Sequence, residues 1–222
     1  MTEFVMMGIL PDIASGLHIT IPQAGYLITA YALGVVVGAP TLVSLVAGRP
    51  PRSVLVWFML MFAIFNAMSA FAPNFEIMMV SRFLAGLPHG AFFGVGAVVA
   101  SRLADEGRTA AAVATMFTGL TLANVLGVPL GTWIGHVIDW RLVFLIVAVI
   151  GVLTMLSLRQ WVPHIEPVKR TGIMQDLRIF RHLDLWLALG IVSIGTGGFF
   201  AWFSYIAPLL TDVTRFDSTT IP

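Results

Sequence analysis

Two ionisable side chains, Glu3 and Arg82, stand in apolar stretches where an isolated charge is costly. Inserting an arginine at the centre of a membrane helix costs about 2.5 to 3.5 kcal/mol, so an arginine at that depth needs a partner. A carboxylate buried alone tends to be neutral, whereas a nearby cation favours its ionised form. We therefore expect Glu3 to bind and release a proton and Arg82 to sense its charge. A structural ion pair, or an Arg82 side chain that reaches the lipid headgroups, are the alternatives.

A second set of polar and aromatic side chains could line a cavity for a solute. His89 lies seven residues after Arg82, with Gly86 between them, a spacing that puts all three on one helix face. The imidazole of His89 could relay protons or bind a solute, although a lone histidine in a membrane helix equally forms an interhelical hydrogen bond. The other candidates for the cavity are Tyr31, Asn124, Phe199 and Trp202. The aromatic residues could instead pack against a neighbouring helix or lipid, and Asn124 could form an interhelical hydrogen bond.

The composition defines the class of protein. Of the 222 residues, 58% are hydrophobic and only 10% are charged, and the mean hydropathy is +0.94. Soluble domains carry about 25% charged residues, so this sequence is that of an integral membrane protein. A net charge of +1 argues against a nucleic-acid partner, and the lack of cysteine excludes disulfides and thiolate metal sites.

No sequence pattern of an enzyme is found. The chain lacks a Gly-x-Ser-x-Gly elbow, a His-Glu-x-x-His motif and a glycine-rich phosphate loop. The spacing of His89 and His136 is not that of a metal site. We expect neither an enzyme nor a bound metal or cofactor, and the expected partners are a small solute, protons and the lipid bilayer.

Apolar runs of about 20 residues, the length that a helix needs to cross a bilayer, follow one another along the chain. The predicted spans are Ala24–Ala47, Ser53–Ala72, Ile77–Ser101, Thr109–Ile138, Leu142–Leu158 and Leu185–Leu210. Before Pro11 there are only about ten residues, half of a span. We expect them to be the second half of a helix whose beginning is missing. The predicted fold is an all-α polytopic membrane protein, since barrel strands would be short alternating segments.

Basic residues are unequally distributed between the loops. One side carries Arg49, Arg52, Arg102, Arg108, Arg159, Lys169, Arg170, Arg178 and Arg181. The other side carries only Arg141 and Arg215. By the positive-inside rule the richer side is cytoplasmic. The span of Arg82 then runs inward, with Arg82 in its outer half at a depth similar to that of Glu3.

One long loop divides the chain. Residues 159–184 hold five of the nine basic residues of the richer side and are interrupted by Pro163, Pro167 and Gly172. We expect an N-terminal transmembrane bundle at 1–158, a cytoplasmic linker at 159–184, and at 185–222 the first helix of a second bundle.

Several stretches together resemble a known family. They are TEFVMMGILPDIA at Thr2–Ala14, ITAYALGVVVGAP at Ile28–Pro40, SRFLAGLPHGAFFGVGAVVAS at Ser81–Ser101, and ATMFTGLTLANVLGVPLGTWIG at Ala114–Gly135 followed by DWRLVF. The chain resembles bacterial major facilitator superfamily (MFS) transporters, most of all the twelve-helix drug:proton antiporters and the arabinose or sugar efflux permeases among them. The resemblance implies the N-terminal six-helix bundle of the MFS fold plus the seventh helix, with the start of helix 1 and helices 8 to 12 missing.

The family's motifs are matched unevenly. Arg82 and Gly86 match the helix 4 motif, and the resemblance implies a role for Arg82 in proton coupling. The Gly-x-Pro-x-Gly core of the helix 5 antiporter motif is matched by Gly127, Pro129 and Gly131. The loop between helices 2 and 3 retains only Arg52 of its motif, with Ala47 in place of aspartate and Pro50 in place of glycine. This departure puts in doubt the conformational latch that the resemblance would otherwise imply for this loop.

Independently of the resemblance, Gly127, Gly131 and Gly135 form a small-residue face that lets helices approach closely, and Pro129 can bend the helix. Simple packing is the alternative to a role in motion.

The expected function is proton-coupled export of a small organic solute, sugar or drug-like, by alternating access. The expected location is the bacterial inner membrane, and the full-length protein is expected to be a monomer. A non-transporting truncated protein or a partner-dependent half-transporter is the alternative.

Overall fold

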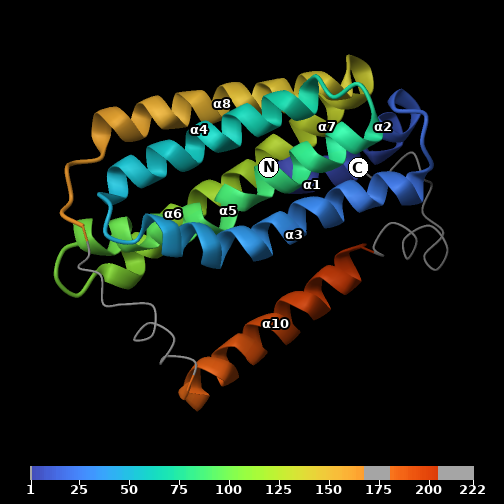
Figure 1. Cartoon of the computed structure of the whole chain (residues 1–222). Coiled ribbons are helices and arrows are strands. Elements are labelled where there is room, and N and C mark those ends of the chain that lie inside the picture. Colours follow the sequence, from blue (N-terminus) through green and yellow to red (C-terminus); the bar gives the residue numbers. More distant parts are fainter. Residues whose placement is uncertain (1, 168–180, 205–222) are drawn as a thin grey trace. The chain divides into compact units, whose positions relative to one another are not determined.

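The computed structural model describes residues 2–167 and 181–204, with side chains as far as Phe199, and every regular element in these ranges is a helix (Figure 1). It comprises two units, Met1–Lys169 and Arg170–Pro222. The helices of the first unit are α1 (Thr2–Gly8), α2 (Leu10–Gly16), α3 (Ile21–Val46), α4 (Pro51–Ala70), α5 (Phe75–Leu103), α6 (Thr109–Leu122), the π-helical turn η1 (Ala123–Gly127), α7 (Val128–Val137) and α8 (Trp140–Trp161). The second unit contains α10 (Leu183–Ser204).

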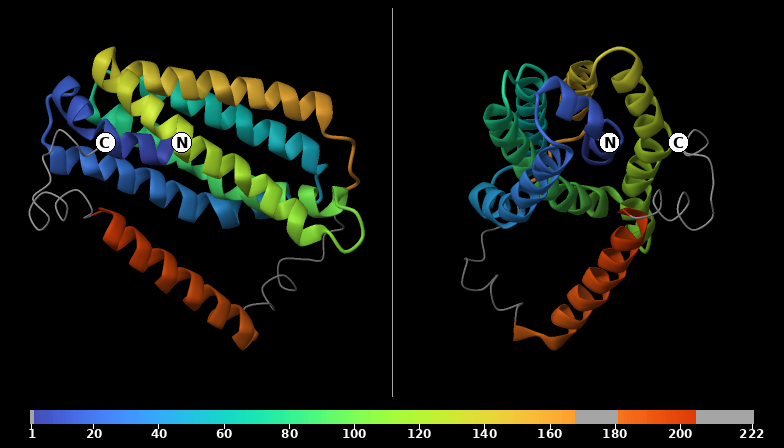
Figure 2. Two further views of the ribbon diagram at one scale, coloured as in Figure 1. Left: turned by 180° about the vertical axis from the view of Figure 1, so that it is seen from behind. Right: turned by 90° about the vertical axis from the view of Figure 1, so that its right-hand side faces the viewer.

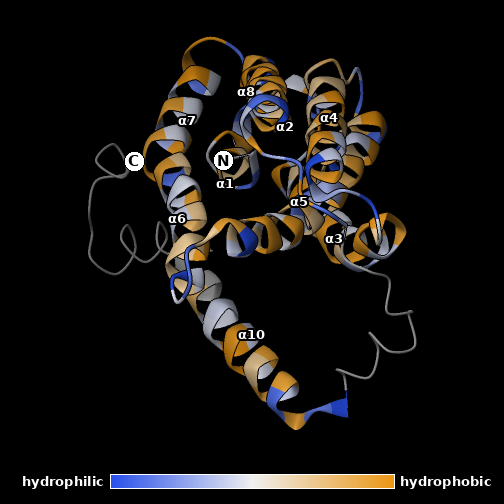
Figure 3. Cartoon of the chain, turned by 90° about the vertical axis from the view of Figure 1, so that its left-hand side faces the viewer, coloured by the Kyte–Doolittle hydropathy of each residue, from blue (hydrophilic) through white to orange (hydrophobic). Residues whose placement is uncertain are grey.

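The predicted all-α membrane fold is confirmed. In the described ranges, five helices are long and apolar enough to cross a membrane: α3, α4, α5, the continuous helix made of α6, η1 and α7, and α8. Many of their residues carry the hydrophobic colour in Figure 3. The predicted span Leu185–Leu210 corresponds to α10, although residues 205–210 lie outside the described part of the chain. So do residues 168–180 of the expected linker, and the proposed boundaries at 158 and 184 stay predictions.

Side-chain caps determine where three of the long helices begin. Thr20 and Gln23 form a capping box, in which each side chain bonds the other's backbone N–H, so α3 begins at Ile21 rather than at the predicted Ala24. The side chain of Asn74 accepts a hydrogen bond from the N–H of Ile77 and starts α5. Asp139 caps α8 in the same way.

The N-terminal segment is helical over a longer stretch than its ten apolar residues predict. After α1 the chain continues almost without interruption into α2, which ends at Gly16. Pro11 lies in the first turn of α2, where a missing N–H costs little because that group has no helical partner. The N–H of Ile13 still donates to the carbonyl of Ile9 at 3.1 Å. The expectation that this helical segment stops at Pro11 is therefore wrong.

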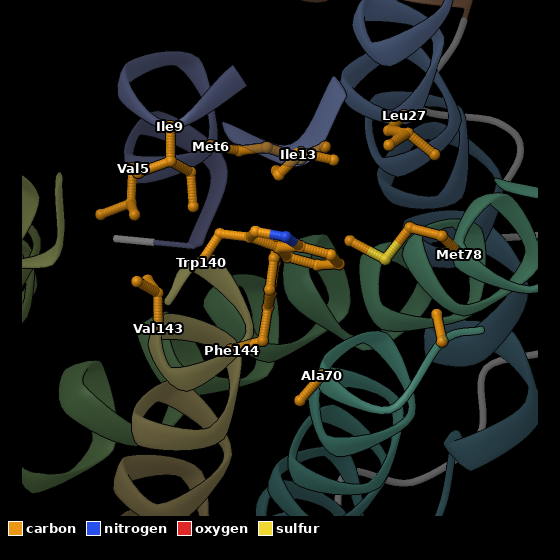
Figure 4. Close-up of a cluster of buried hydrophobic side chains, with 11 residues drawn as sticks. Val5, Met6, Ile9, Ile13, Leu27, Ala70, Met78, Trp140, Val143 and Phe144 are labelled. Atoms are coloured by element: carbon orange, nitrogen blue, oxygen red, sulfur yellow. The ribbon is translucent and has the colours of Figure 1, made fainter. Parts of the chain in front are cut away.

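The helices of the first unit pack around α1, which end-on views show among the longer helices (Figures 2 and 3). The pairs α3 with α5 and α4 with α8 make extensive contacts. Trp140 and Phe144 of α8 lie edge to face at the centre of an apolar cluster, and Val5 and Ile9 from the N-terminal segment point toward them (Figure 4). This cluster anchors the N-terminal segment inside the bundle.

Candidate functional site

A buried polar layer separates two apolar clusters along the bundle. On α5, Met78 belongs to one cluster and Ala91 to the other, and Arg82 lies between them. On α4 the order is Ala70, then Asn66, then Phe58. The side chains of this layer are called the Arg82 cluster below; its members are Thr2, Tyr31, Asn66, Arg82 and His89.

Arg82 is the centre of the cluster and is fully buried, with 0% of its surface exposed. Its Nη1 donates a hydrogen bond to Thr2 Oγ1 at 3.2 Å, and its Nη2 donates to the Thr2 carbonyl at 3.4 Å. Its guanidinium carbon lies 4.3 Å from the centre of the Tyr31 ring and 5.4 Å from that of Phe144. A desolvated cation over an aromatic face gains about 2 kcal/mol. The snorkelling alternative is therefore wrong, because Arg82 points into the bundle.

Thr2 connects Arg82 to a third helix. Its hydroxyl, which accepts from Arg82, donates to Asn66 Oδ1 at 2.9 Å, and Asn66 Nδ2 donates to the carbonyl of Phe62 at 2.8 Å. The four groups form a chain in which every donor points the same way, from α5 through α1 to α4. Such chains strengthen in a low dielectric. The arginine is thus held by neutral groups.

Glu3 lies beside this chain but not in it. Within residues 2–167 the structure records no hydrogen bond or ion pair between Arg82 and a carboxylate, and the direct partner is Thr2. Glu3 is half-buried on the next position of α1 and lies within electrostatic range of the guanidinium. The expected direct contact between Glu3 and Arg82 is not formed here, whereas the expected role of the two residues in proton coupling stays a prediction.

Tyr31 and His89, both proposed to line a cavity, lie next to Arg82 and contact each other. Tyr31 is fully buried, and its hydroxyl oxygen lies 2.5 Å from His89 Nδ1. Tyr31 therefore faces the interior of the bundle rather than an open cavity. His89 is partly buried, and the centre of its ring lies 5.2 Å from that of Phe93. The ring of Phe93 in turn stacks on Phe117 of α6, with 5.5 Å between the two ring centres.

The remaining cavity candidates are not part of this cluster. Asn124 lies in η1, and its Oδ1 is shielded from solvent with no hydrogen-bond partner in the described ranges. Phe199 is 56% exposed on α10 of the second unit. The side chain of Trp202 lies outside the described residues.

The three glycines of the small-residue face divide between two environments. Gly127 and Gly131 line an apolar cavity of about 250 Å³ between α7 and α8. Gly135 packs against Ile9, where a Cβ atom would collide with the isoleucine side chain. Pro129 is the second residue of α7 and lacks the N–H that would bond Val125 in an α-helix, which explains the π geometry of the preceding turn. The expected close packing is found at Gly135. The helix departs from α geometry in the π-helical turn before Pro129.

Two contacts join helix ends on opposite sides of the bundle. Arg52, the remnant of the loop motif, donates a hydrogen bond to the Arg159 carbonyl and so links the start of α4 to the end of α8. At the other end, His136 Nδ1 of α7 lies 2.7 Å from Asp12 Oδ2 of α2. Arg52 is partly exposed, and the side chains of His136 and Asp12 are 46% and 29% exposed.

Sequence reasoning missed Thr2 as a site residue, and it assigned Asn66 only an interhelical hydrogen bond, which the contact with Thr2 is. A hydroxyl next to Glu3 carries no pattern of its own, and its distance from Asn66 in the sequence is 64 residues. The available signal was the cost of Arg82 itself, which required a partner without specifying one.

A bundle of apolar helices that buries one arginine in a hydrogen-bonded layer is a polytopic membrane protein with an intramembrane charge of the kind that marks transport pathways. The sequence model of the Major Facilitator Superfamily matches residues 1–222. The chain belongs to this superfamily of transporters and is not an enzyme.

Three relatives illustrate the range of the similarity. The chain is 45% identical over 214 residues to the inner membrane transport protein YdhP of Escherichia coli K12, which covers 96% of this chain and 55% of that protein. It is 33% identical over 215 residues to a chloramphenicol resistance protein of Streptomyces lividans (95% and 55%). It is 30% identical over 223 residues to a probable sugar efflux transporter of Helicobacter pylori P12 (99% and 57%). The chain spans about half the length of these relatives.

Proposed function

We propose that this chain forms the N-terminal half of a proton-coupled exporter that moves a small organic solute across the bacterial inner membrane by alternating access. The observation that carries the proposal is a fully buried Arg82 whose direct partner is the neutral Thr2 and not the adjacent carboxylate of Glu3. A buried arginine held this way can exchange one partner for another when a neighbouring charge changes.

The coupling step is an exchange of partners at Arg82. With Glu3 protonated, the guanidinium bonds Thr2, as in the arrangement described here. When Glu3 releases its proton, the carboxylate attracts the guanidinium, because opposite charges in a low dielectric attract strongly. Arg82 stays charged throughout, and the proton that Glu3 takes up on the outer side leaves on the cytoplasmic side as the solute moves outward. The loss of one contact and gain of another shifts α1 against α5.

The class of solute is proposed from the relatives. One is named for chloramphenicol resistance and another for sugar efflux, so a sugar or a drug-like compound is the proposed solute. The loop after α8 is proposed to lie on the cytoplasmic side, since basic residues gather at that end, and the full-length transporter is proposed to act as a monomer.

Everted vesicles that contain the full-length protein test this function. Accumulation of labelled pentoses, hexoses and chloramphenicol is measured with and without a pH gradient. We expect accumulation of one solute that depends on the gradient, and its loss in Glu3→Gln. Glu76→Gln, which changes a carboxylate in the first turn of α5, is the control and should transport normally. Gradient-driven transport that survives in Glu3→Gln would overturn the assignment of Glu3.

A further inference from the structure

We propose that Tyr31 and His89 are positioning residues that hold Arg82 against Thr2, rather than residues that contact the solute. This inference rests on the proposed function for its consequence in transport, but the positioning itself follows from the contacts. Tyr31 is fully buried, so a solute has no access to it in this arrangement. One face of its ring covers the Arg82 guanidinium at 4.3 Å, and its hydroxyl bonds His89.

The backbone of Tyr31 is held as firmly as its ring. α3 and α5 approach so closely that a Cβ atom on Gly86 would collide with the Tyr31 carbonyl oxygen. Gly34 and Gly38 lie in the same way against the backbone of Phe83 and Leu87. Because the backbone of Tyr31 is fixed at Gly86, the hydrogen bond to His89 determines the remaining freedom, which is the tilt of the ring under Arg82.

His89 is built into this arrangement from both sides. Its Nδ1 pairs with Tyr31, and its ring packs on Phe93, which stacks on Phe117 of α6 with an angle of 6° between the two ring planes. The ionisable side chains that act on it are Arg82 of α5 and Tyr31 of α3. α6 contributes the aromatic ring of Phe117 to this stack. His89 therefore connects α6 to the orientation of Tyr31, and through it to Arg82.

Hydrogen–deuterium exchange of the purified full-length protein tests the positioning role without a transport substrate. The reporter is α1, because Arg82 holds this helix through Thr2. The described contacts of Tyr31 and His89 do not include α1. Loss of one buried hydrogen bond changes an opening equilibrium by about fivefold. We expect Tyr31→Phe and His89→Leu each to speed exchange in peptides of residues 2–17 by about that factor, and the double variant to add nothing further.

Matched variants separate positioning from packing. Tyr26→Phe makes the same chemical change at an exposed position of α3 and should leave α1 unchanged. His89→Asn keeps an acceptor near the position of Nδ1 and should restore slow exchange. Faster exchange confined to α3 and α5, or effects of the two single variants that multiply in the double variant, would overturn the proposal.

A pH profile of gradient-driven export in the same variants connects positioning to coupling. We expect Tyr31→Phe and His89→Leu to shift the profile and Tyr26→Phe to leave it unchanged. An unshifted profile in both variants would overturn the consequence for transport. If the wild-type protein exports nothing under a pH gradient while α1 still loosens in the variants, the proposed function fails and the positioning role of Tyr31 and His89 stands.

Discussion

The hydroxyl of Thr2 lies 2.9 Å from Asn66 Oδ1 and at the same time accepts a hydrogen bond from Arg82. One small side chain thus pairs with a donor of a buried cation and with the oxygen of a buried amide, from two other helices. Neither polar group has water to replace this contact, since Asn66 and Arg82 are both 0% exposed. The N-terminal segment is held in the bundle by this contact as well as by the apolar cluster around Trp140.

Replacing Thr2 with valine should destabilise the protein without changing its shape. The substitution leaves a donor of Arg82 and the acceptor of Asn66 unpaired, and a buried unsatisfied group costs about 1 to 3 kcal/mol. We expect the free energy of unfolding to fall by about 2 kcal/mol, measured by thermal unfolding in detergent. Thr2→Ser keeps the hydroxyl and serves as the control. Equal stability of the two variants would show that the hydrogen bond contributes nothing.

Arg82→Lys should impair coupling while the protein still folds. A lysine ammonium is a point charge and lacks the planar fork that reaches both the hydroxyl and the carbonyl of Thr2. Loss of one charge-assisted hydrogen bond, about 1.5 kcal/mol, corresponds to a drop in gradient-driven export of about tenfold. Export by vesicles is normalised to the amount of folded protein. Wild-type export by Arg82→Lys would mean that the charge alone suffices.

Gly86→Ala should disrupt the packing of α3 on α5. The added methyl group meets the backbone carbonyl of Tyr31, which cannot move aside as a side chain can. Overpacking of this kind costs about 1 to 3 kcal/mol. Gly94→Ala on the same helix is the matched control, because a Cβ atom there has nothing within 4 Å. Melting temperatures and yields of the two variants in detergent test the difference, and equal values would contradict the close approach.

The pair of His136 and Asp12 should contribute little to stability. Its side chains are 46% and 29% exposed, and ion pairs near the surface contribute about 1 kcal/mol or less. We expect His136→Gln and Asp12→Asn each to lower the melting temperature slightly, with the difference shrinking in high salt because ions screen exposed charges. A large effect that persists in high salt would assign the pair a role in the stability of the bundle.

Much of the fold can be predicted from the sequence, for a physical reason. In a bilayer a helix must satisfy its own backbone, so apolar runs of sufficient length predict spans directly. The predicted ends differ from the observed ones where a side chain intervenes, as at Thr20, whose capping box with Gln23 extends α3. The N-terminal segment was harder to predict, because Pro11 is compatible both with the end of a helix and with the first turn of the next.

The candidate site could be predicted only in part. The cost of a charge in lipid identifies Arg82 from sequence, and helical spacing puts His89 on its face. The partner of Arg82 depends on which residue of α1 faces α5, and α1 is too short for its periodicity to decide between Thr2 and Glu3. The close approach of Tyr31 to α5 depends on Gly34 and Gly38 of α3. Their packing partners, Phe83 and Leu87, lie on α5 and cannot be identified from the sequence of α3 alone.

The π-helical turn before Pro129 sets the rotational phase of α7 relative to α6. A π turn holds one residue more than an α turn, so its return to α geometry would rotate α7 about its own axis by about 100°, the angle of one residue in an α-helix. Such a rotation would carry Gly135 away from Ile9 and replace it with a bulkier neighbour. The phase that this turn sets is therefore what places a glycine, and not a bulkier residue, against the N-terminal segment that holds Arg82.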